Sequence, residues 1–298
     1  MATFRNRTLI SPITRFVSDE YIRTLLILFS AIVFVFFTSK EYIPFIARFF
    51  MPFLLILLMT AAEMRQRAVL LFWIVLGLAL NVGMNYYVVA NHGFMITFIG
   101  LALMIACASG DTAPAVMSRA AVLLISILMG LALIQKGVST HYMSGALLGG
   151  YLANGYMFKT LISLFYSDWP EVVKQNLDAQ KMLLAQRPGG GATVALTIPF
   201  WVQLLAVVLT YAALASQTLI ELFILFRKRL GIWTHYAVLL FVLIIYSTRN
   251  ENVFLSMNLI LGFAITDEHT KRARLWYVIG IAYLLIMEMM GLRPGIIS

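Results

Sequence analysis

The sequence predicts an all-α protein, a bundle of helices embedded in a membrane, and three observations support this prediction. Of its 298 residues, 61% are hydrophobic and only 12% are charged, and the mean hydropathy is +0.90. A water-facing domain could not hide so many apolar side chains in one core. Long apolar runs recur along the chain, and none shows the alternating pattern that a membrane barrel needs. We therefore predict a polytopic integral membrane protein with about nine transmembrane helices.

The formal net charge of +9 comes largely from basic residues that lie in short clusters between the apolar runs. The clusters are Arg5, Arg7, Arg15 and Arg23; Arg65 and Arg67; Arg227, Lys228 and Arg229; and Lys271, Arg272 and Arg274. This positive-inside pattern predicts a cytoplasmic N-terminus and accounts for the charge without a nucleic acid. We expect the lipid bilayer, in a bacterial cytoplasmic (inner) membrane, to be the main partner of the chain.

Nine apolar stretches are expected to cross the membrane as helices. They cover about residues 21–38, 43–62, 68–89, 94–109, 119–136, 193–226, 233–247, 253–266 and 275–291. Residues 1–20 are polar and basic and are expected along the cytoplasmic surface. The connection from 110 to 118, with Asp111 and Pro114, is interpreted as a turn. No long linker or repeat divides the chain, so residues 1–298 are expected to form a single membrane domain.

Residues 142–166 are apolar but are interrupted by four glycines, Gly145, Gly149, Gly150 and Gly155. A full crossing here would place the later basic cluster on the wrong side of the membrane. We therefore expect a re-entrant or interfacial helix that lines a cavity, where irregular backbone is tolerated. The Gly145-to-Gly149 spacing is equally typical of close contact between helices, and both interpretations remain open.

Residues 167–191 form the one sizeable polar stretch. Apolar residues alternate there with charges in a way that predicts an amphipathic surface helix. Such a helix could bind a protein partner.

The candidates for chemistry are ionisable residues within or beside the apolar runs. They are Arg48, Glu63, His92, Lys136, Glu221, His235 and Glu288. Such residues are costly in a membrane and are therefore candidates for function. Each also has a structural explanation: a lysine at a helix end, for example, can extend its charge to the surface. The sequence has no phosphate-binding loop, dinucleotide fingerprint, nucleophile elbow or zinc-type spacing, and we expect no metal site.

Three separated stretches resemble the motifs of one family, the membrane domain of the vitamin K-dependent gamma-carboxylase, also known as the horizontally transferred transmembrane (HTTM) family. The stretch from Asn91 to Met95 is similar to its N-N-H-x-Y-L signature. Ala132 to Lys136, followed nine residues later by Gly145, resembles A-G-x-x-K-L…W-x-x-G, with Tyr142 where a tryptophan is usual. The third block is an acidic residue, a basic turn and a histidine that opens the next span, here Glu221, Arg227, Arg229 and His235.

The resemblance implies an enzyme that acts with a reduced, vitamin K-like quinone, such as a quinol-dependent carboxylase, epoxidase-like lyase or oxidoreductase. Lys136 would be the base that deprotonates the quinol, and His92 and His235 would be histidines of the same pocket. The implied cofactor-binding residues are Asn91, Gln135, Tyr142 and Gly145. A lysine in an apolar pocket can be neutral near pH 7, as this role requires.

A second hypothesis is a non-catalytic membrane subunit, or an export or immunity-type partner, within a larger complex. Leu133 stands where the family motif has glycine, and the polar stretch at 167–191 is suited to contact another protein. A small-molecule transporter is a third hypothesis. It is disfavoured because the sequence shows no inverted repeat with paired, interrupted helices.

Overall fold

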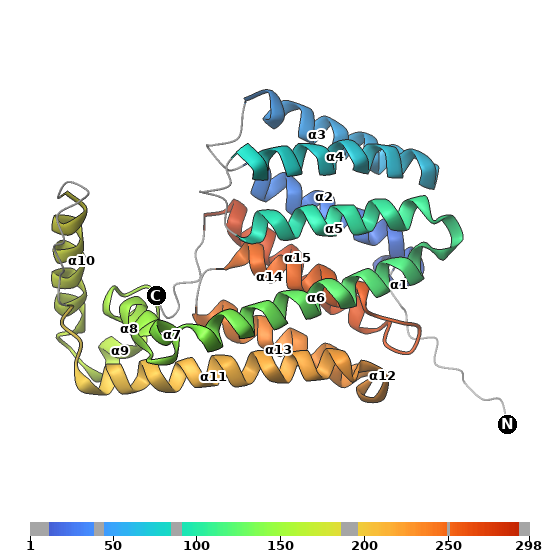
Figure 1. The fold of residues 1–298 in the computed structure, drawn as a ribbon. Coiled ribbons are helices and arrows are strands. Elements are labelled where there is room, and N and C mark those ends of the chain that lie inside the picture. The colour runs from blue at the N-terminus through green and yellow to red at the C-terminus, as the bar shows by residue number, and fades with distance from the viewer. Residues whose placement is uncertain (1–11, 39–44, 85–90, 186–195, 249–250, 292–298) are drawn as a thin grey trace. The chain divides into compact units, whose positions relative to one another are not determined.

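The computed structural model describes residues 12–38, 45–84, 91–185, 196–248 and 251–291, and all secondary structure in these ranges is helical (Figure 1). The elements are α1 (Pro12–Asp19), α2 (Tyr21–Thr38), α3 (Phe45–Thr60), α4 (Met64–Met84), α5 (Asn91–Ala108), η1 (Gly110–Thr112), α6 (Ala113–Val138), α7 (Thr140–Met143), α8 (Ala146–Ala153), α9 (Lys159–Phe165), α10 (Trp169–Ala185), α11 (Phe200–Leu225), α12 (Arg227–Leu230), α13 (Ile232–Thr248), α14 (Asn252–Ala264) and α15 (Ala273–Met289). The prediction of an all-α fold is confirmed.

Three helical segments in the described part of the chain are long and apolar enough to cross a membrane. They are Met64–Met84, Gly110–Val138 and Phe200–Leu225, with mean hydropathies of 1.9, 2.2 and 1.7. Shorter apolar helices cover Tyr21–Phe36, Phe50–Thr60, Gly93–Ala108, Ile232–Ser247 and Asn252–Ala264. The chain is therefore a helical membrane protein.

The helix α4 illustrates how such a span folds. Its buried residues are Leu71, Ile74, Leu78 and Val82, which recur every three or four positions and so lie on one face. The opposite face is also apolar, and Val69, Trp73 and Leu80 are more than half exposed there. Because lipid accepts an apolar outer face, the inner face is defined by close packing and not by a polar–apolar contrast.

The structure divides into two compact units. Unit 1 comprises Met1–Ser126, Phe226–Leu239 and Asn252–Leu292. Its centre is α14, which contacts α2, α5 and α15 and is buried at Asn252 and at every residue from Leu255 to Ala264. The ring of Tyr21 stacks on that of Phe263 at 5.7 Å, and the Tyr21 hydroxyl donates a hydrogen bond to the Ala264 carbonyl.

Unit 2 comprises Ile127–Leu225, Leu240–Glu251 and Arg293–Ser298. The short helices α7 and α8 contact the long helix α11, and α9 and α10 follow them. An apolar cluster forms the core of this unit: Leu148, Leu152, Met157, Ile162, Trp169, Val173, Val202 and Ala206.

The glycines of residues 142–166 allow this close packing. Gly145 has a φ of +78°, and a Cβ atom added there would lie 2.9–3.1 Å from Cγ2, N and Cα of Val207. A Cβ at Gly149 would lie 3.8 Å from Cβ of Ala206. Close helix contact is therefore what the structure shows at this pair, while a re-entrant course through the membrane stays a prediction.

Two helix starts differ clearly from the sequence prediction: α11 begins at Phe200 and not near residue 193, and α6 begins earlier than expected. The stretch 110–118 was interpreted as a turn, but the structure has η1 at Gly110–Thr112 and begins α6 at Ala113. Pro114 therefore lies in the first turn of the helix. Proline is tolerated there because the first N–H groups of a helix have no intrahelical partner.

Candidate functional site

Lys136 lies in the last turn of α6 and is fixed to a second helix. Its Nζ donates a hydrogen bond of 2.8 Å to Oε1 of Gln217 on α11. The same Nζ lies 5.2 Å from the centroid of the Tyr142 ring. All three residues belong to unit 2, so the lysine joins the end of α6, the start of the next segment and α11.

The turn between α6 and α7 places Tyr142 next to Lys136. The Ser139 N–H donates to the Lys136 carbonyl at 3.3 Å, and the Ser139 side chain accepts from the Tyr142 N–H at 3.2 Å. Ser139 therefore acts as the N-cap of α7. The Tyr142 side chain is buried, at 6% exposure.

The contact of Gly145 with Val207 holds this segment against α11. Ten residues after Val207, on the same helix, Gln217 is buried at 7% exposure. Glu221 follows Gln217 by four positions, and residues four apart share one face of a helix. One face of α11 thus carries an amide, which contacts the lysine, and a carboxylate one turn further along the helix.

This arrangement is suited to hold a positive charge. An amide oxygen accepts a hydrogen bond from an ammonium group, and the face of an aromatic ring attracts a cation. Lys136 itself is only partly buried, so its side chain is not sealed from its surroundings. A group in the surrounding lipid could therefore approach the ammonium.

His235 lies in unit 1, near the start of α13, in a different kind of environment. It is 3% exposed, and its Nδ1 is 3.0 Å from the hydroxyl oxygen of Tyr277 on α15. The two rings are edge-to-face, with centroids 5.7 Å apart. A Cβ at Gly262 on α14 would lie 2.5 Å from Cε1 of Tyr277, so only glycine leaves room for this ring.

The other predicted site residues have different outcomes. Gln135 is exposed, and Gly145 contributes close packing against Val207. Asn91 and His92 are the first residues of α5, and their side chains lie outside the described residues. The structure therefore brings Lys136 and Tyr142 together.

Lys136 belongs to unit 2 and His235 to unit 1, so a common pocket for Lys136, His92 and His235 stays a prediction. Among the described residues, no group of three His, Cys, Asp or Glu side chains is placed to hold a metal ion.

Sequence reasoning missed Gln217, Tyr277 and Gly262. The available signal for Gln217 was an amide well inside a 26-residue apolar helix, whose other glutamine, Gln203, lies near its start. Tyr277 and Gly262 carry no comparable signal, because tyrosine and glycine are both common in membrane helices. Their roles depend on which helices are neighbours.

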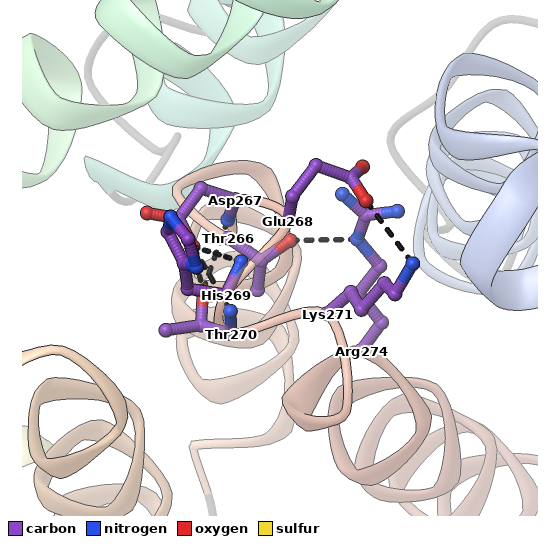
Figure 2. A network of polar contacts seen from close by, with 7 residues as sticks. All are labelled: Thr266, Asp267, Glu268, His269, Thr270, Lys271 and Arg274. Atoms are coloured by element: carbon purple, nitrogen blue, oxygen red, sulfur yellow. Dashed lines mark hydrogen bonds and ion pairs between the residues drawn. The ribbon is translucent and has the colours of Figure 1, made fainter.

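A turn between α14 and α15 holds a compact network of polar contacts, shown in Figure 2. The Asp267 carboxylate accepts hydrogen bonds of 2.9 Å from the N–H groups of His269 and Thr270 and from the Thr270 hydroxyl. Partial burial raises the pKa of Asp267, but these hydrogen bonds outweigh it and hold the pKa below its usual value. These hydrogen bonds hold the conformation of the turn that leads into α15.

Arg274 departs from its predicted role in a basic surface cluster. It is only 4% exposed, and its Nε donates a hydrogen bond of 2.9 Å to the Thr266 hydroxyl (Figure 2). Its guanidinium carbon lies 4.9 Å from the Tyr21 ring centroid and 5.9 Å from that of Phe263. Arg274 thus stabilises the packing of α2, α14 and α15 within unit 1.

The fold and this site define an all-helical membrane protein with a partly buried lysine held between helices. No protein-family model, characterised protein or solved structure matches the chain. The likeness to the gamma-carboxylase membrane domain therefore rests on the three sequence motifs.

Proposed function

We propose that the chain is a membrane enzyme that acts with a reduced quinone, with Lys136 as the proton-accepting base. The observation that carries this proposal is the 2.8 Å hydrogen bond from Lys136 Nζ to Gln217 Oε1, with the Tyr142 ring beside it. These neighbours favour an ammonium group, which is the state of the lysine after it has accepted a proton.

The residues around Lys136 fit a lipid-soluble aromatic diol. The exposed side chains of Leu131, Ile134 and Val138 form an apolar surface at the end of α6, on the face of the helix away from Lys136, so an isoprenoid tail would reach this surface by passing around the helix. When bound, a reduced quinone supplies an acidic hydroxyl and two reducing electrons. The lysine and the amide of Gln217 supply the polar groups that would orient that hydroxyl.

In the proposed step, neutral Lys136 accepts a proton at Nζ from a hydroxyl group, so that one O–H bond breaks and one N–H bond forms. The ammonium then donates to Gln217 Oε1 and faces the Tyr142 ring, which stabilise the positive charge. Gly145 holds the backbone of this segment on α11. The sequence resemblance also implies roles for Asn91, His92, Gln135 and His235, but the proposed step needs only Lys136, Gln217 and Tyr142.

Turnover of a reduced quinone tests this proposal. Purified protein in nanodiscs is supplied with reduced menaquinone and oxygen, and oxidation of the quinol is followed by its absorbance. Lys136→Ala should reduce turnover at least about 100-fold, as expected for loss of a general base. The control is Lys181→Ala, which removes an exposed lysine of the same unit and should leave turnover unchanged. Normal turnover by Lys136→Ala would contradict the role of base.

We also propose the membrane placement that this function requires. The chain has about nine crossings in a bacterial inner membrane, with its N-terminus in the cytoplasm. Shorter apolar helices such as the 18-residue α2 add to the three long spans, and the basic clusters support the orientation.

The alternative function is a non-catalytic membrane subunit, and α10 is the observation that favours it. Asn176 anchors this helix, since its Nδ2 donates at 3.0 Å to the carbonyls of Ala153 and Thr197. The remaining face exposes Glu171, Lys174 and other polar groups. Crosslinking of α10 to a stoichiometric partner would support this function, and purification as a stable, isolated monomer would contradict it.

A further inference from the structure

An open hollow of about 500 Å³ lies at the turn between α3 and α4, within unit 1. Its wall is apolar and its rim is polar. The wall includes Leu57, Val69 and Leu70, and the rim includes Glu63, Arg65 and Gln66. The hollow therefore offers an apolar surface next to two opposite charges.

The place of the hollow along the helices sets its depth in a bilayer. Arg65 is in the first turn of α4, one of the three helices long enough to span a membrane. The charged ends of such a span lie at the level of the lipid headgroups. Below the rim, the exposed side chains of Ile56, Val69 and Trp73 continue as an apolar surface at the depth of acyl chains.

Both charged side chains at the rim, Glu63 and Arg65, are available to a ligand. Neither the Glu63 carboxylate nor the Arg65 guanidinium makes a hydrogen bond or ion pair with another described residue, and both are exposed. Arg67 is different, because its Nε donates to the Ala61 carbonyl at 3.0 Å and its Nη1 to Met64 Sδ at 3.6 Å. One anionic and one cationic side chain therefore face outward within two residues of each other.

We infer that this hollow binds a phospholipid of the phosphatidylethanolamine type. The phosphate pairs with Arg65, the primary ammonium pairs with Glu63, and one acyl chain lies along Leu57 and Leu70. A guanidinium group binds phosphate through parallel, charge-assisted hydrogen bonds, and a carboxylate accepts hydrogen bonds from a primary ammonium. The adjacent opposite charges match a headgroup that carries both charges.

Native mass spectrometry of the detergent-solubilised full chain tests the assignment. The probes are phosphatidylethanolamine, phosphatidylglycerol and diacylglycerol with identical acyl chains. Wild-type protein should bind phosphatidylethanolamine most tightly and diacylglycerol most weakly. Arg65→Gln should weaken phosphatidylethanolamine binding about tenfold, as expected for the loss of a charge-assisted contact. Glu63→Gln should weaken phosphatidylethanolamine binding but not phosphatidylglycerol binding.

Arg272→Gln is the matched control, because it removes the same charge from an exposed position outside the hollow. It should leave phosphatidylethanolamine binding unchanged. Val69→Trp fills the hollow from an exposed position and should weaken binding of all the glycerolipids. Equal binding of diacylglycerol, a preference for phosphatidylglycerol, or full binding by Arg65→Gln would each overturn the inference.

Discussion

The environments of Lys136 and His235 differ in how much room they leave for a ligand. Lys136 is only partly buried, so part of its side chain remains open to the surroundings. His235 is 3% exposed, its partner Tyr277 is fully buried, and Gly262 leaves no space beneath the Tyr277 ring. In this conformation a molecule in the lipid can reach the Lys136 side chain, whereas the His235–Tyr277 pair leaves no space for a ligand.

This difference distinguishes two roles that a pair of polar side chains can have inside a membrane protein, helix packing and ligand binding. A closed pair that fills its space supports the packing of helices, and its loss should appear mainly as loss of stability. An accessible pair contributes less to stability, and its loss should appear mainly in ligand binding. The following predictions test whether the two pairs divide in this way.

The largest effect is expected for Gly262→Ala. The new Cβ would lie 2.5 Å from Cε1 and 2.7 Å from Cζ of Tyr277, so α14 and α15 would have to separate. We expect a loss of about 3 kcal/mol, at the upper end of overpacking effects, measured as a lower melting temperature in detergent. Gly83→Ala is the control, because nothing lies within 4 Å of its added Cβ. Equal stability of the two variants would show that the pair is not tightly packed.

Tyr277→Phe should have the next largest effect on stability. It removes the hydroxyl group 3.0 Å from His235 Nδ1 and leaves a buried polar atom without this partner. The expected cost is about 1–3 kcal/mol. Thermal unfolding of the variant checks this value, and a melting temperature equal to that of wild type would mean that the hydrogen bond does not stabilise unit 1.

Gln217→Leu should destabilise the protein less, because Lys136 is only partly buried. A double-mutant cycle with Lys136→Met isolates the interaction between the two side chains. We expect a coupling of about 0.6–1 kcal/mol, in the range measured for hydrogen bonds inside membranes. A coupling near zero would indicate that the lysine and the amide do not interact in the bilayer.

The smallest effect concerns Asp267 and depends on pH. Because its folded pKa is below the usual value, its ionised form contributes stability above the unfolded pKa, about pH 4, and this is lost as pH falls through the folded pKa. The stability gap between wild type and Asp267→Asn should therefore shrink when melting is measured at decreasing pH. A gap that widens on acidification would contradict this assignment.

Much of the helical fold follows from the sequence, because a long apolar run is a strong signal. Residues 21–38 were predicted as a helix, and α2 has the same bounds, Tyr21–Thr38. The start of α6 was placed too late because Pro114 was included in a turn at 110–118, although proline fits the first turn of a helix. Hydropathy does not predict the division into two compact units, because the apolar spans of both units have similar hydropathy.

The candidate site was predictable only in part. Lys136 and Tyr142 are close to each other in the chain, and the sequence resemblance named both as site residues. The pairs Lys136–Gln217 and His235–Tyr277 join residues 81 and 42 positions apart. Such contacts depend on which helix faces pack together, and apolar spans that tolerate lipid on their outer side do not reveal those faces.

The central claim, that Lys136 marks a quinone site, is tested most directly by photo-crosslinking. The protein in nanodiscs is exposed to a menaquinone analogue with a diazirine on its ring, and the labelled peptides are mapped by mass spectrometry. We predict labelling around Lys136–Tyr142 and around Gln217, competed by unlabelled menaquinone and lost in Lys136→Ala. Labelling that is confined to other segments, or that persists without change in Lys136→Ala, would contradict the claim.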